Sequence, residues 1–227
     1  MILAAGVGER MRPLTLHTPK PLLRVAGLPL LEHHITRLAA AGFRELVVNV
    51  SHLGQQICDY CGDGSQWDVA IGYSYEETPL ETAGGIINAM PLLGDAPFLV
   101  VNGDIWIDYP FAQLGNIALR SGETARLVMV DNPPQHPLGD FQLDAQQWIR
   151  VLPAGAMGCT YAGVGVYTPA FFAGVPAGKM PLRPLLDAAI TKGQLGGEHY
   201  QGRWHDVGTP ERLQHLDALL SANSRQH

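Results

Sequence analysis

The sequence predicts an α/β fold with a largely parallel sheet, and two observations lead to this prediction. Short apolar runs alternate with helical patterns along the chain, as in proteins built from βαβ units. The chain has 227 residues, 46% of them hydrophobic and 16% charged, which is typical of a globular domain. We therefore expect residues 1–227 to form a single domain.

The apolar runs and the helical patterns give the order of the expected elements. Strands are predicted at residues 1–5, 45–50, 69–75, 97–102, 125–130 and 161–167. Helices are predicted at residues 29–42, 53–61, 82–91, 109–121, 181–193 and 210–222. From residue 132 the sequence reads "NPPQHPLGDFQLDAQQWIRVLP", in which short runs of alternating apolar and polar residues lie among prolines and glycines. This pattern indicates a small antiparallel insertion beside the main sheet.

Composition excludes several classes of partner. The net charge of −6 and the lack of a basic run argue against nucleic acid. No apolar stretch approaches the ~20 residues that cross a membrane, and the N-terminus lacks the features of a signal peptide. We therefore expect a cytoplasmic protein without a membrane partner. Only two residues precede Leu3, so a natural start upstream of Met1 is a further expectation.

The pair Cys58 and Cys61 forms a C-x-x-C, for which redox or zinc chemistry must be considered. Ile57 and Cys61 are four residues apart on one face of a predicted helix, and no second cysteine pair exists for a four-sulfur site. The favoured interpretation is ordinary helix cysteines.

The stretch "LAAGVGERMRPLTLHTPKPL", residues 3–22, places a glycine turn at the carboxyl end of the first strand, where open α/β sheets bind ligands. It lacks the third glycine of a dinucleotide fingerprint, and Pro21 follows Lys20 where a P-loop needs Ser or Thr. Arg10, Arg12 and Lys20 on a loop stiffened by prolines suit a polyphosphate; the alternative is a surface loop with scattered cations. Lys20 is expected to be exposed.

Two acidic stretches fit phosphoryl-transfer chemistry. "VVNGD" ends a strand with Asn102 and Asp104, and "WHDVGTPERL" places Asp206 before a helix. Carboxylates from separate segments, completed by phosphate oxygens, suit Mg²⁺. Taken alone, an aspartate at a strand end is more often a turn or capping residue than a metal ligand.

Residues 3–6, Gly8, Arg10, 13–15 and 19–21 together resemble the signature of the sugar-1-phosphate nucleotidyltransferases. The resemblance implies a Rossmann-like three-layer sandwich with a mostly parallel mixed sheet, in which the glycine loop wraps a nucleoside triphosphate. It also implies division into a nucleotide-binding part (1–131), a sugar-binding part (132–207) and a C-terminal helix (208–227).

The same resemblance implies the site residues. Those implied to bind the nucleotide are Leu3, Ala5, Gly6, Gly8, Glu9, Arg10, Lys20, Glu76, Glu81, Thr82 and Asn102. Those implied to act in catalysis are Arg12, Lys20 and Asp104, with Mg²⁺ on Asp104 and Asp206. Those implied to bind the sugar are Gly139, Glu198 and Asp206.

Short bacterial members of this family, which use UTP and N-acetylmuramic acid 1-phosphate in cell-wall recycling, share "LETxGGI", "GEHYxGxW" and "DVGT" with the chain. This similarity implies UTP and that sugar 1-phosphate as substrates. The alternatives are a mannose- or heptose-1-phosphate guanylyltransferase and a non-catalytic module that binds nucleotide sugars. Oligomeric state is not readable from the sequence.

The chain departs from the family at residues 150–160, where many members carry a lysine that grips the sugar phosphate. Arg150, Arg203 or Lys179 is expected to substitute, or the metal to carry more of the charge. Arg203 is also a candidate partner for the carboxylate of muramic acid.

The histidines offer a rival metal site. His199, His205 and Asp206 are close in sequence, but an extended strand would not make the three converge on one zinc ion. His33 and His34 are expected on a partly exposed helix surface.

Overall fold

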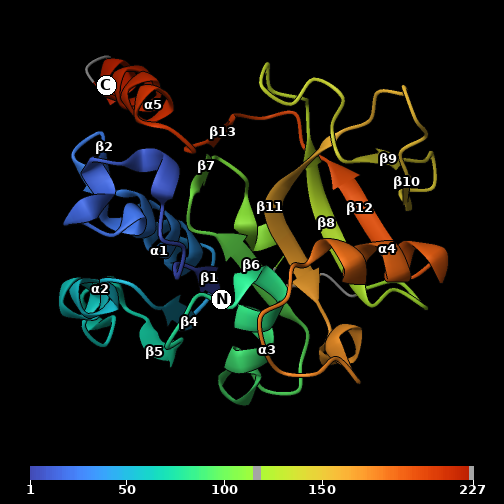
Figure 1. Cartoon of the computed structure of the whole chain (residues 1–227), viewed down its shortest axis with the longest axis horizontal. Helices are drawn as coiled ribbons and strands as arrows, with labels where there is room; N and C mark the ends of the chain where they lie inside the picture. The colour runs from blue at the N-terminus through green and yellow to red at the C-terminus, as the bar shows by residue number, and fades with distance from the viewer. Residues whose placement is uncertain (115–118, 225–227) are drawn as a thin grey trace.

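A computed structural model of the chain describes residues 1–114 and 119–224. Its main sheet has the strand order β12–β8–β11–β6–β1–β4–β5 (Figure 1). In that order the strands are Leu195–His199, Ala125–Val130, Thr160–Tyr167, Phe98–Asn102, Ile2–Leu3, Glu45–Val50 and Ala70–Tyr75. β11 is antiparallel to both of its neighbours, and the other neighbouring pairs are parallel. The predicted mostly parallel mixed sheet is confirmed.

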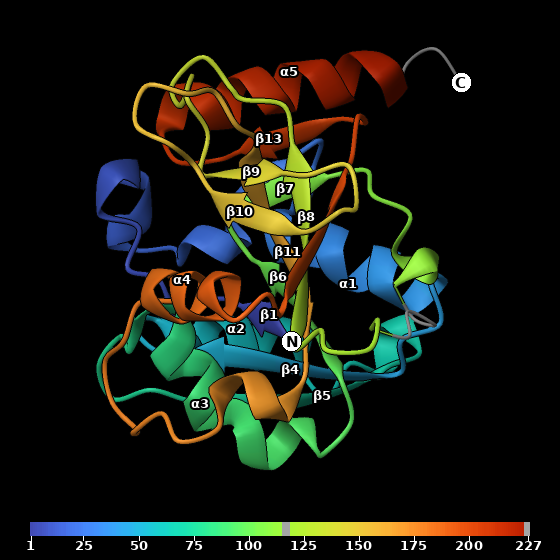
Figure 2. The same cartoon turned by 90° about the vertical axis from the view of Figure 1, so that its right-hand side faces the viewer.

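Helices cover both faces of this sheet. The helices are α1 (Leu30–Ala40), α2 (Gly54–Cys61), α3 (Glu81–Leu93), α4 (Arg183–Thr191) and α5 (Pro210–Ser224). α1 and α2 contribute Leu31, Ile35 and Ile57 to the core on one face, while α3 and α4 contribute Ile86 and Leu186 to the core on the other. Figure 2 shows α1 and α4 on opposite sides of the strands, as a three-layer sandwich requires.

Three two-stranded ribbons flank the sheet. They pair β9 (Phe141–Leu143) with β10 (Ile149–Val151), β7 (Ile105–Ile107) with β13 (Trp204–Asp206), and β2 (Arg24–Val25) with β3 (Leu28–Pro29). All three are antiparallel, and β9–β10 is the insertion expected after residue 132. Short 3₁₀ turns lie at Glu9–Met11, Leu14–Leu16, Lys20–Leu22, Ser65–Trp67, Phe111–Gln113 and Pro169–Phe172.

The long C-terminal helix α5 packs over a third, smaller core rather than on the main sheet. That core joins Met11, Val25, Trp106 and Val207 to Leu216 of α5. The carboxylate of Asp217 also accepts a hydrogen bond from the amide of Ala26, at 2.7 Å. Figure 1 shows α5 beside β2, so the helix holds the N-terminal loop against the segment that carries Asp206.

One predicted helix is wrong. Of residues 109–121, the described part forms only the 3₁₀ turn Phe111–Gln113, and residues 115–118 lie outside the described residues. Tyr109, Phe111 and Leu114 are all buried against the core on the α1 face. The apolar spacing that suggested a helix therefore belongs to a buried turn.

Strand β12 was not predicted, because "LGGEH" is rich in glycine, a poor strand former. Close packing explains why glycine is found at position 197. A Cβ there would lie 2.5 Å from Cδ1 of Ile149 in the β9–β10 ribbon. β7 and β13 are further short strands that the sequence pattern did not reveal. The division of the chain at residues 131 and 207 stays a prediction.

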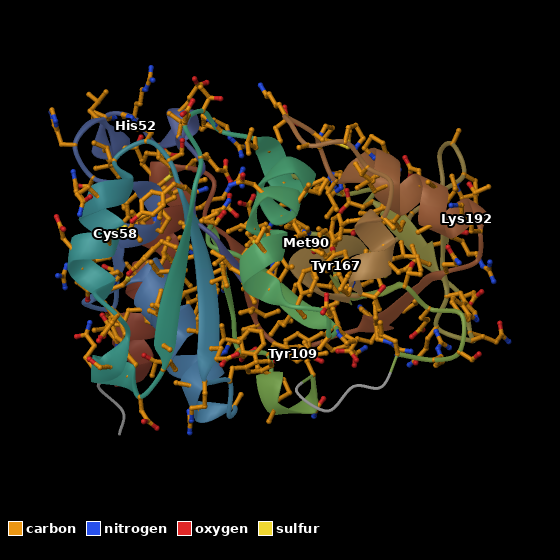
Figure 3. The ribbon with its side chains drawn as sticks, turned by 90° about the horizontal axis from the view of Figure 1, so that it is seen from below. His52, Cys58, Met90, Tyr109, Tyr167 and Lys192 are labelled. Atoms are coloured by element: carbon orange, nitrogen blue, oxygen red, sulfur yellow. The ribbon has the colours of Figure 1, made fainter. Side chains whose placement is uncertain are left out.

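Both cysteines of the C-x-x-C lie on α2. Cys61 is buried in the core, where burial raises the pKa of its thiol to about 12. Cys58 lies on the same helix at the edge of the molecule (Figure 3) and contacts the hydroxyl of Tyr75 at 3.6 Å. Met90 of α3, also labelled in Figure 3, packs against the core that contains Tyr167 of β11.

None of the helices within residues 1–114 and 119–224 has the length and apolar character needed to span a bilayer.

Candidate active site

The site lies at the carboxyl ends of three neighbouring parallel strands. The register pairs Leu3, the last residue of β1, with Asn49 of β4 on one side and Asn102 of β6 on the other. From β1 the chain runs to β4 and β5 on one side and only then returns to β6 on the other. Such a reversal opens a crevice above the strand ends, which is where α/β proteins of this type bind ligands.

A cleft of about 580 Å³ occupies this position. Every residue that the sequence predicted to bind the nucleotide is in its wall, together with Asp104. The lining residues are Leu3, Ala4, Ala5, Gly6, Val7, Gly8, Glu9, Arg10, Met11, Lys20, Pro21, Asn49, Glu76, Pro79, Glu81, Thr82, Asn102, Gly103, Asp104 and Gly208. Their binding roles stay predictions.

Lys20 corrects one expectation, because it is buried rather than exposed. Only 7% of the residue is accessible, since its stem packs against the glycine turn at Gly8 and its ammonium group lies 2.8 Å from the carboxylate of Asp104. The loop therefore holds the cation in the wall of the cleft. This fixed charge suits an anionic ligand, because a preordered group loses little freedom on binding.

Gly103 explains how Asn102 and Asp104 reach the cleft together. A Cβ at this position would lie 2.5 Å from the carbonyl oxygen of Leu3, and the amide of Gly103 donates to that same oxygen at 2.8 Å. Only glycine allows β6 to end so close to β1. The aspartate that follows is thereby placed opposite Lys20.

A buried polar network forms the floor of the cleft. The side-chain oxygen of Asn49 accepts a hydrogen bond from the amide of Ala4, and its nitrogen donates to Glu76 at 2.6 Å. The other oxygen of Glu76 accepts from the amide of Leu80 at 2.8 Å. Gly85 leaves room for this pair, because a Cβ there would lie 2.6 Å from Glu76 Oε1. Sequence reasoning missed Asn49, although an amide within the apolar run "ELVVNV" was the available signal.

A second cavity, of about 240 Å³, adjoins the first. It is lined by Asn102, Asp104, Ile105, Pro133, Gln135, His136, Thr160, Tyr161, Ala162, Gly163, Trp204 and Asp206. Asn102 and Asp104 line both cavities, so they form a shared wall. The β7–β13 ribbon brings Asp206 to this wall, because Asp206 pairs with Ile105, directly after Asp104.

Two of the residues that line the smaller cavity carry carboxylates, the kind of ligand that Mg²⁺ prefers. Asp104 and Asp206 supply two carboxylates, and among the described residues no group of three or more His, Cys, Asp or Glu side chains could hold a metal. Mg²⁺ is commonly bound by one or two carboxylates together with substrate phosphates and water. The residues fit that ion when phosphates complete its coordination.

Three predicted site residues are not among those that line either cavity. Arg12 follows the turn Glu9–Met11 and is exposed. The amide of Gly139 donates to the carbonyl of His136 within its own loop. The carboxylate of Glu198 accepts a hydrogen bond from the hydroxyl of Tyr109. Roles for these residues in binding or catalysis stay predictions.

The histidines are held by separate partners. His199 contacts Asp131 at 2.8 Å, whereas the ring of His205 lies 6.2 Å from that of His215. His34 corrects the expectation of an exposed helix surface: it is buried, its ring contacts the carbonyl of Ile105 at 2.9 Å, and burial lowers its pKa to about 4.

Comparison with known proteins assigns this geometry to a family. A model described as nucleotidyl transferase matches residues 1–223. The chain belongs to the nucleotidyl transferase family. Among relatives of this nucleotidyl transferase, the N-acetylmuramate alpha-1-phosphate uridylyltransferase of Neisseria meningitidis serogroup B is 49% identical over 226 residues, which cover 98% of each chain.

More distant relatives also act on sugar 1-phosphates by name. The protein of the same name from Caulobacter vibrioides is 34% identical to this nucleotidyl transferase, covering 97% of this chain and 96% of the relative. A mannose-1-phosphate guanyltransferase of Aspergillus fumigatus is 32% identical, covering 99% of this chain and 66% of the longer relative. These relatives place the chain among the sugar-1-phosphate nucleotidyltransferases, as its motifs indicated.

Solved structures agree on the fold. A putative glucose-1-phosphate thymidylyltransferase from Bacillus anthracis superposes on this nucleotidyl transferase with a TM-score of 0.86 at 20% identity, covering 97% of this chain and 94% of the other. HddC from Yersinia pseudotuberculosis, complexed with GMP-PN, superposes with a TM-score of 0.79 at 21% identity, covering 96% and 97%.

Proposed function

We propose that the protein transfers a uridylyl group from UTP to N-acetylmuramic acid 1-phosphate, giving UDP-N-acetylmuramic acid and pyrophosphate, with Mg²⁺ as cofactor. Nucleotidyl transfer to a sugar 1-phosphate is the activity of the family. The particular substrates are supported by the 49% identity to the Neisseria meningitidis enzyme over 98% of both chains. Muramic acid is a bacterial cell-wall sugar, so we expect a role in cell-wall recycling, in the cytoplasm.

The observation that carries the proposal is the shared wall of the two cavities. The larger one, beside the glycine loop, would take the nucleoside triphosphate, and the smaller one the sugar 1-phosphate. Asn102 and Asp104 then lie between the two ligands, where a phosphate oxygen of the sugar would attack the α-phosphorus and pyrophosphate would leave.

The residues of the wall would act by positioning and by neutralising charge. The attacking phosphate is already ionised near neutral pH, so no general base is needed, and phosphoryl transfer depends mostly on alignment and electrostatics. Lys20 would hold the triphosphate, and Asp104 and Asp206 would hold Mg²⁺, which supplies positive charge to the phosphates.

The decisive experiment measures pyrophosphate release with UTP, dTTP, GTP and CTP against several sugar 1-phosphates, with Mg²⁺ and with EDTA. We expect the fastest release with UTP and N-acetylmuramic acid 1-phosphate, and none with EDTA. Preference for GTP with mannose 1-phosphate would favour a guanylyltransferase instead. Binding of UDP-sugars without any pyrophosphate release would indicate a non-catalytic binding module.

The carboxylate of muramic acid needs a partner, and His136 is better placed than Arg203. His136 lines the smaller cavity, and its Nε2 atom is held 3.1 Å from Asp140 Oδ1. Arg203 is absent from that lining, and its guanidinium donates to Asp108 at 2.9 Å.

We therefore expect His136→Ala to raise KM about tenfold for N-acetylmuramic acid 1-phosphate, the effect of losing ~1.4 kcal/mol. KM for N-acetylglucosamine 1-phosphate, which lacks the carboxylate, should change little. Steady-state kinetics with both sugars would check this, and equal changes for both would contradict it.

A further inference from the structure

The smaller cavity presents a charge problem for a sugar 1-phosphate. Two of its lining residues, Asp104 and Asp206, are carboxylates, and the described lining includes neither lysine nor arginine. A phosphate carries up to two negative charges and would be repelled by such a wall unless a cation lies nearby. The lysine that many family members place before residue 161 is absent from this chain.

The three substitutes expected from the sequence are held by other partners. Arg150 bonds Asp144 at 2.8 Å on the β9–β10 ribbon, and Arg203 bonds Asp108 at 2.9 Å. Lys179 lies 3.6 Å from Glu81. None of the three lines either cavity, and none of their partners Asp144, Asp108 and Glu81 lines the smaller one.

A fourth cation, Arg212, is also not among the lining residues, but it contacts a residue of each cavity. It lies in the first turn of α5, and its Nη1 donates to Oδ2 of Asp206, which lines the smaller cavity. A Cβ on Gly208, which lines the larger cleft, would lie 3.0 Å from the same Nη1 atom. The guanidinium therefore lies beside one lining residue of each cavity.

We propose that Arg212 binds the phosphate of the incoming sugar 1-phosphate and so replaces the missing lysine. A guanidinium has five N–H donors, of which the contact with Asp206 uses one at Nη1. Its side chain is 28% exposed, and we assign its remaining donors to the phosphate. A planar guanidinium also matches two phosphate oxygens, which a lysine cannot.

The Arg212–Asp206 pair resembles the Lys20–Asp104 pair, which lies beside the larger cleft. Lys20 bonds Asp104 beside the larger cleft, and Arg212 bonds Asp206 beside the smaller cavity. Each carboxylate thus has its own cation. The inference rests on the proposed function, because it assigns the second cation to the second substrate of the same reaction.

Kinetics of the full chain test the assignment. Arg212→Ala should raise KM for N-acetylmuramic acid 1-phosphate about tenfold or more, while KM for UTP changes less than about threefold. Arg212→Lys should recover part of the loss, because it keeps the charge but not the paired donors. An unchanged KM for the sugar 1-phosphate would overturn the proposal.

A purely structural role for Arg212 predicts a different pattern. If the residue only orients Asp206, then higher Mg²⁺ should restore activity in Arg212→Ala and the KM for the sugar 1-phosphate should stay at the wild-type value; that result also overturns the proposal. Arg183→Ala is the matched control, since Arg183 is also a first-turn helical arginine paired with an aspartate, Asp187. It should leave both KM values within about twofold of wild type.

A binding measurement separates this inference from the proposed activity. Calorimetry in Mg²⁺ would compare N-acetylmuramic acid with its 1-phosphate on wild type and on Arg212→Ala. The wild type should bind the phosphorylated sugar more tightly, and Arg212→Ala should lose most of that difference. If wild type shows the difference but no pyrophosphate release, the proposed function fails while Arg212 keeps its role. If wild type shows no difference, the role of Arg212 fails.

Discussion

Gly6 has more open surroundings than Gly8, the other glycine of the loop. No heavy atom lies within 4 Å of the position that a Cβ would take, and the residue lines the larger cleft. By contrast, a Cβ on Gly8 would lie 3.0 Å from Thr15 Cγ2 and 3.3 Å from Lys20 Cβ. The folded chain therefore explains a glycine at position 8, whereas at position 6 it leaves space that a ligand can use.

Gly6→Ala should consequently separate stability from binding. We expect a stability equal to or about 0.4–1 kcal/mol above wild type, because alanine restricts the unfolded chain. KM for UTP should rise about tenfold, because the methyl group would project into the cleft. Urea unfolding and steady-state kinetics would measure the two effects.

Gly72→Ala is the control for Gly6→Ala, since Gly72 lies in strand β5 and a Cβ there would meet only an ordinary contact at 4.0 Å. It should leave KM for UTP unchanged. A wild-type KM in Gly6→Ala would show that the ligand does not approach this residue.

The residues at the cleft were predictable from sequence where a motif fixed their spacing. They were less predictable where their position depends on burial in the folded chain. The loop around Lys20 and the aspartate after "VVNG" were placed at the cleft from sequence. Burial of Lys20 was missed, because it depends on the packing of its stem against Gly8. Arg212 was missed although it lies with Asp206 in "WHDVGTPERL", because their contact depends on how the turn before α5 folds.

At the scale of elements, α5 joins two parts of the site that are far apart in sequence. Its Leu216 is fully buried with Trp106 and Val207, and the same small core includes Met11 of the glycine loop. The helix therefore stabilises the loop and the Asp206 segment together.

Leu216→Ala should lower the free energy of unfolding by about 2–5 kcal/mol, because it opens a cavity in this core. Thermal or urea unfolding would measure the loss. Leu219→Ala on the same helix is the control, since Leu219 is 41% exposed and should cost less than about 0.5 kcal/mol. Equal losses in the two variants would show that α5 does not depend on this contact.

Helices and strands were predictable from sequence where the apolar pattern continued over many residues. Helices α1 to α5 and strands β4, β5, β6, β8 and β11 lie where the pattern placed them, within a few residues. β12 was missed because its glycines are there for close packing, not for strand propensity. The helix at 109–121 was wrong because Tyr109 and Phe111 are buried in a short turn. That burial depends on residues far away in the sequence, which a local pattern does not contain.

For the whole molecule, His34 links global stability to pH. It lies on α1, buried beneath β7, and burial lowers its pKa from 6.5 to about 4. The unfolded chain therefore binds a proton at a pH where the native state does not. Stability from this group is complete above pH 6.5 and is lost as the pH falls towards 4, by up to ~3 kcal/mol.

His34→Gln should remove this part of the acid sensitivity, since an amide can still donate to the carbonyl of Ile105 but does not titrate. Urea unfolding at pH 7 and at pH 4.5 would compare the two proteins. The wild type should lose more stability over this interval than the variant. Equal losses would show that His34 does not set the dependence.

Asn102 and Asp104 belong to two cavities at once, and this has a consequence for inhibitor design. A single molecule that crosses their shared wall gains contacts in both spaces but loses its translational freedom only once. Linking a fragment chosen for one space to a fragment chosen for the other should therefore give far higher affinity than either fragment alone. Because the two cavities share Asn102 and Asp104, we expect a short linker to suffice.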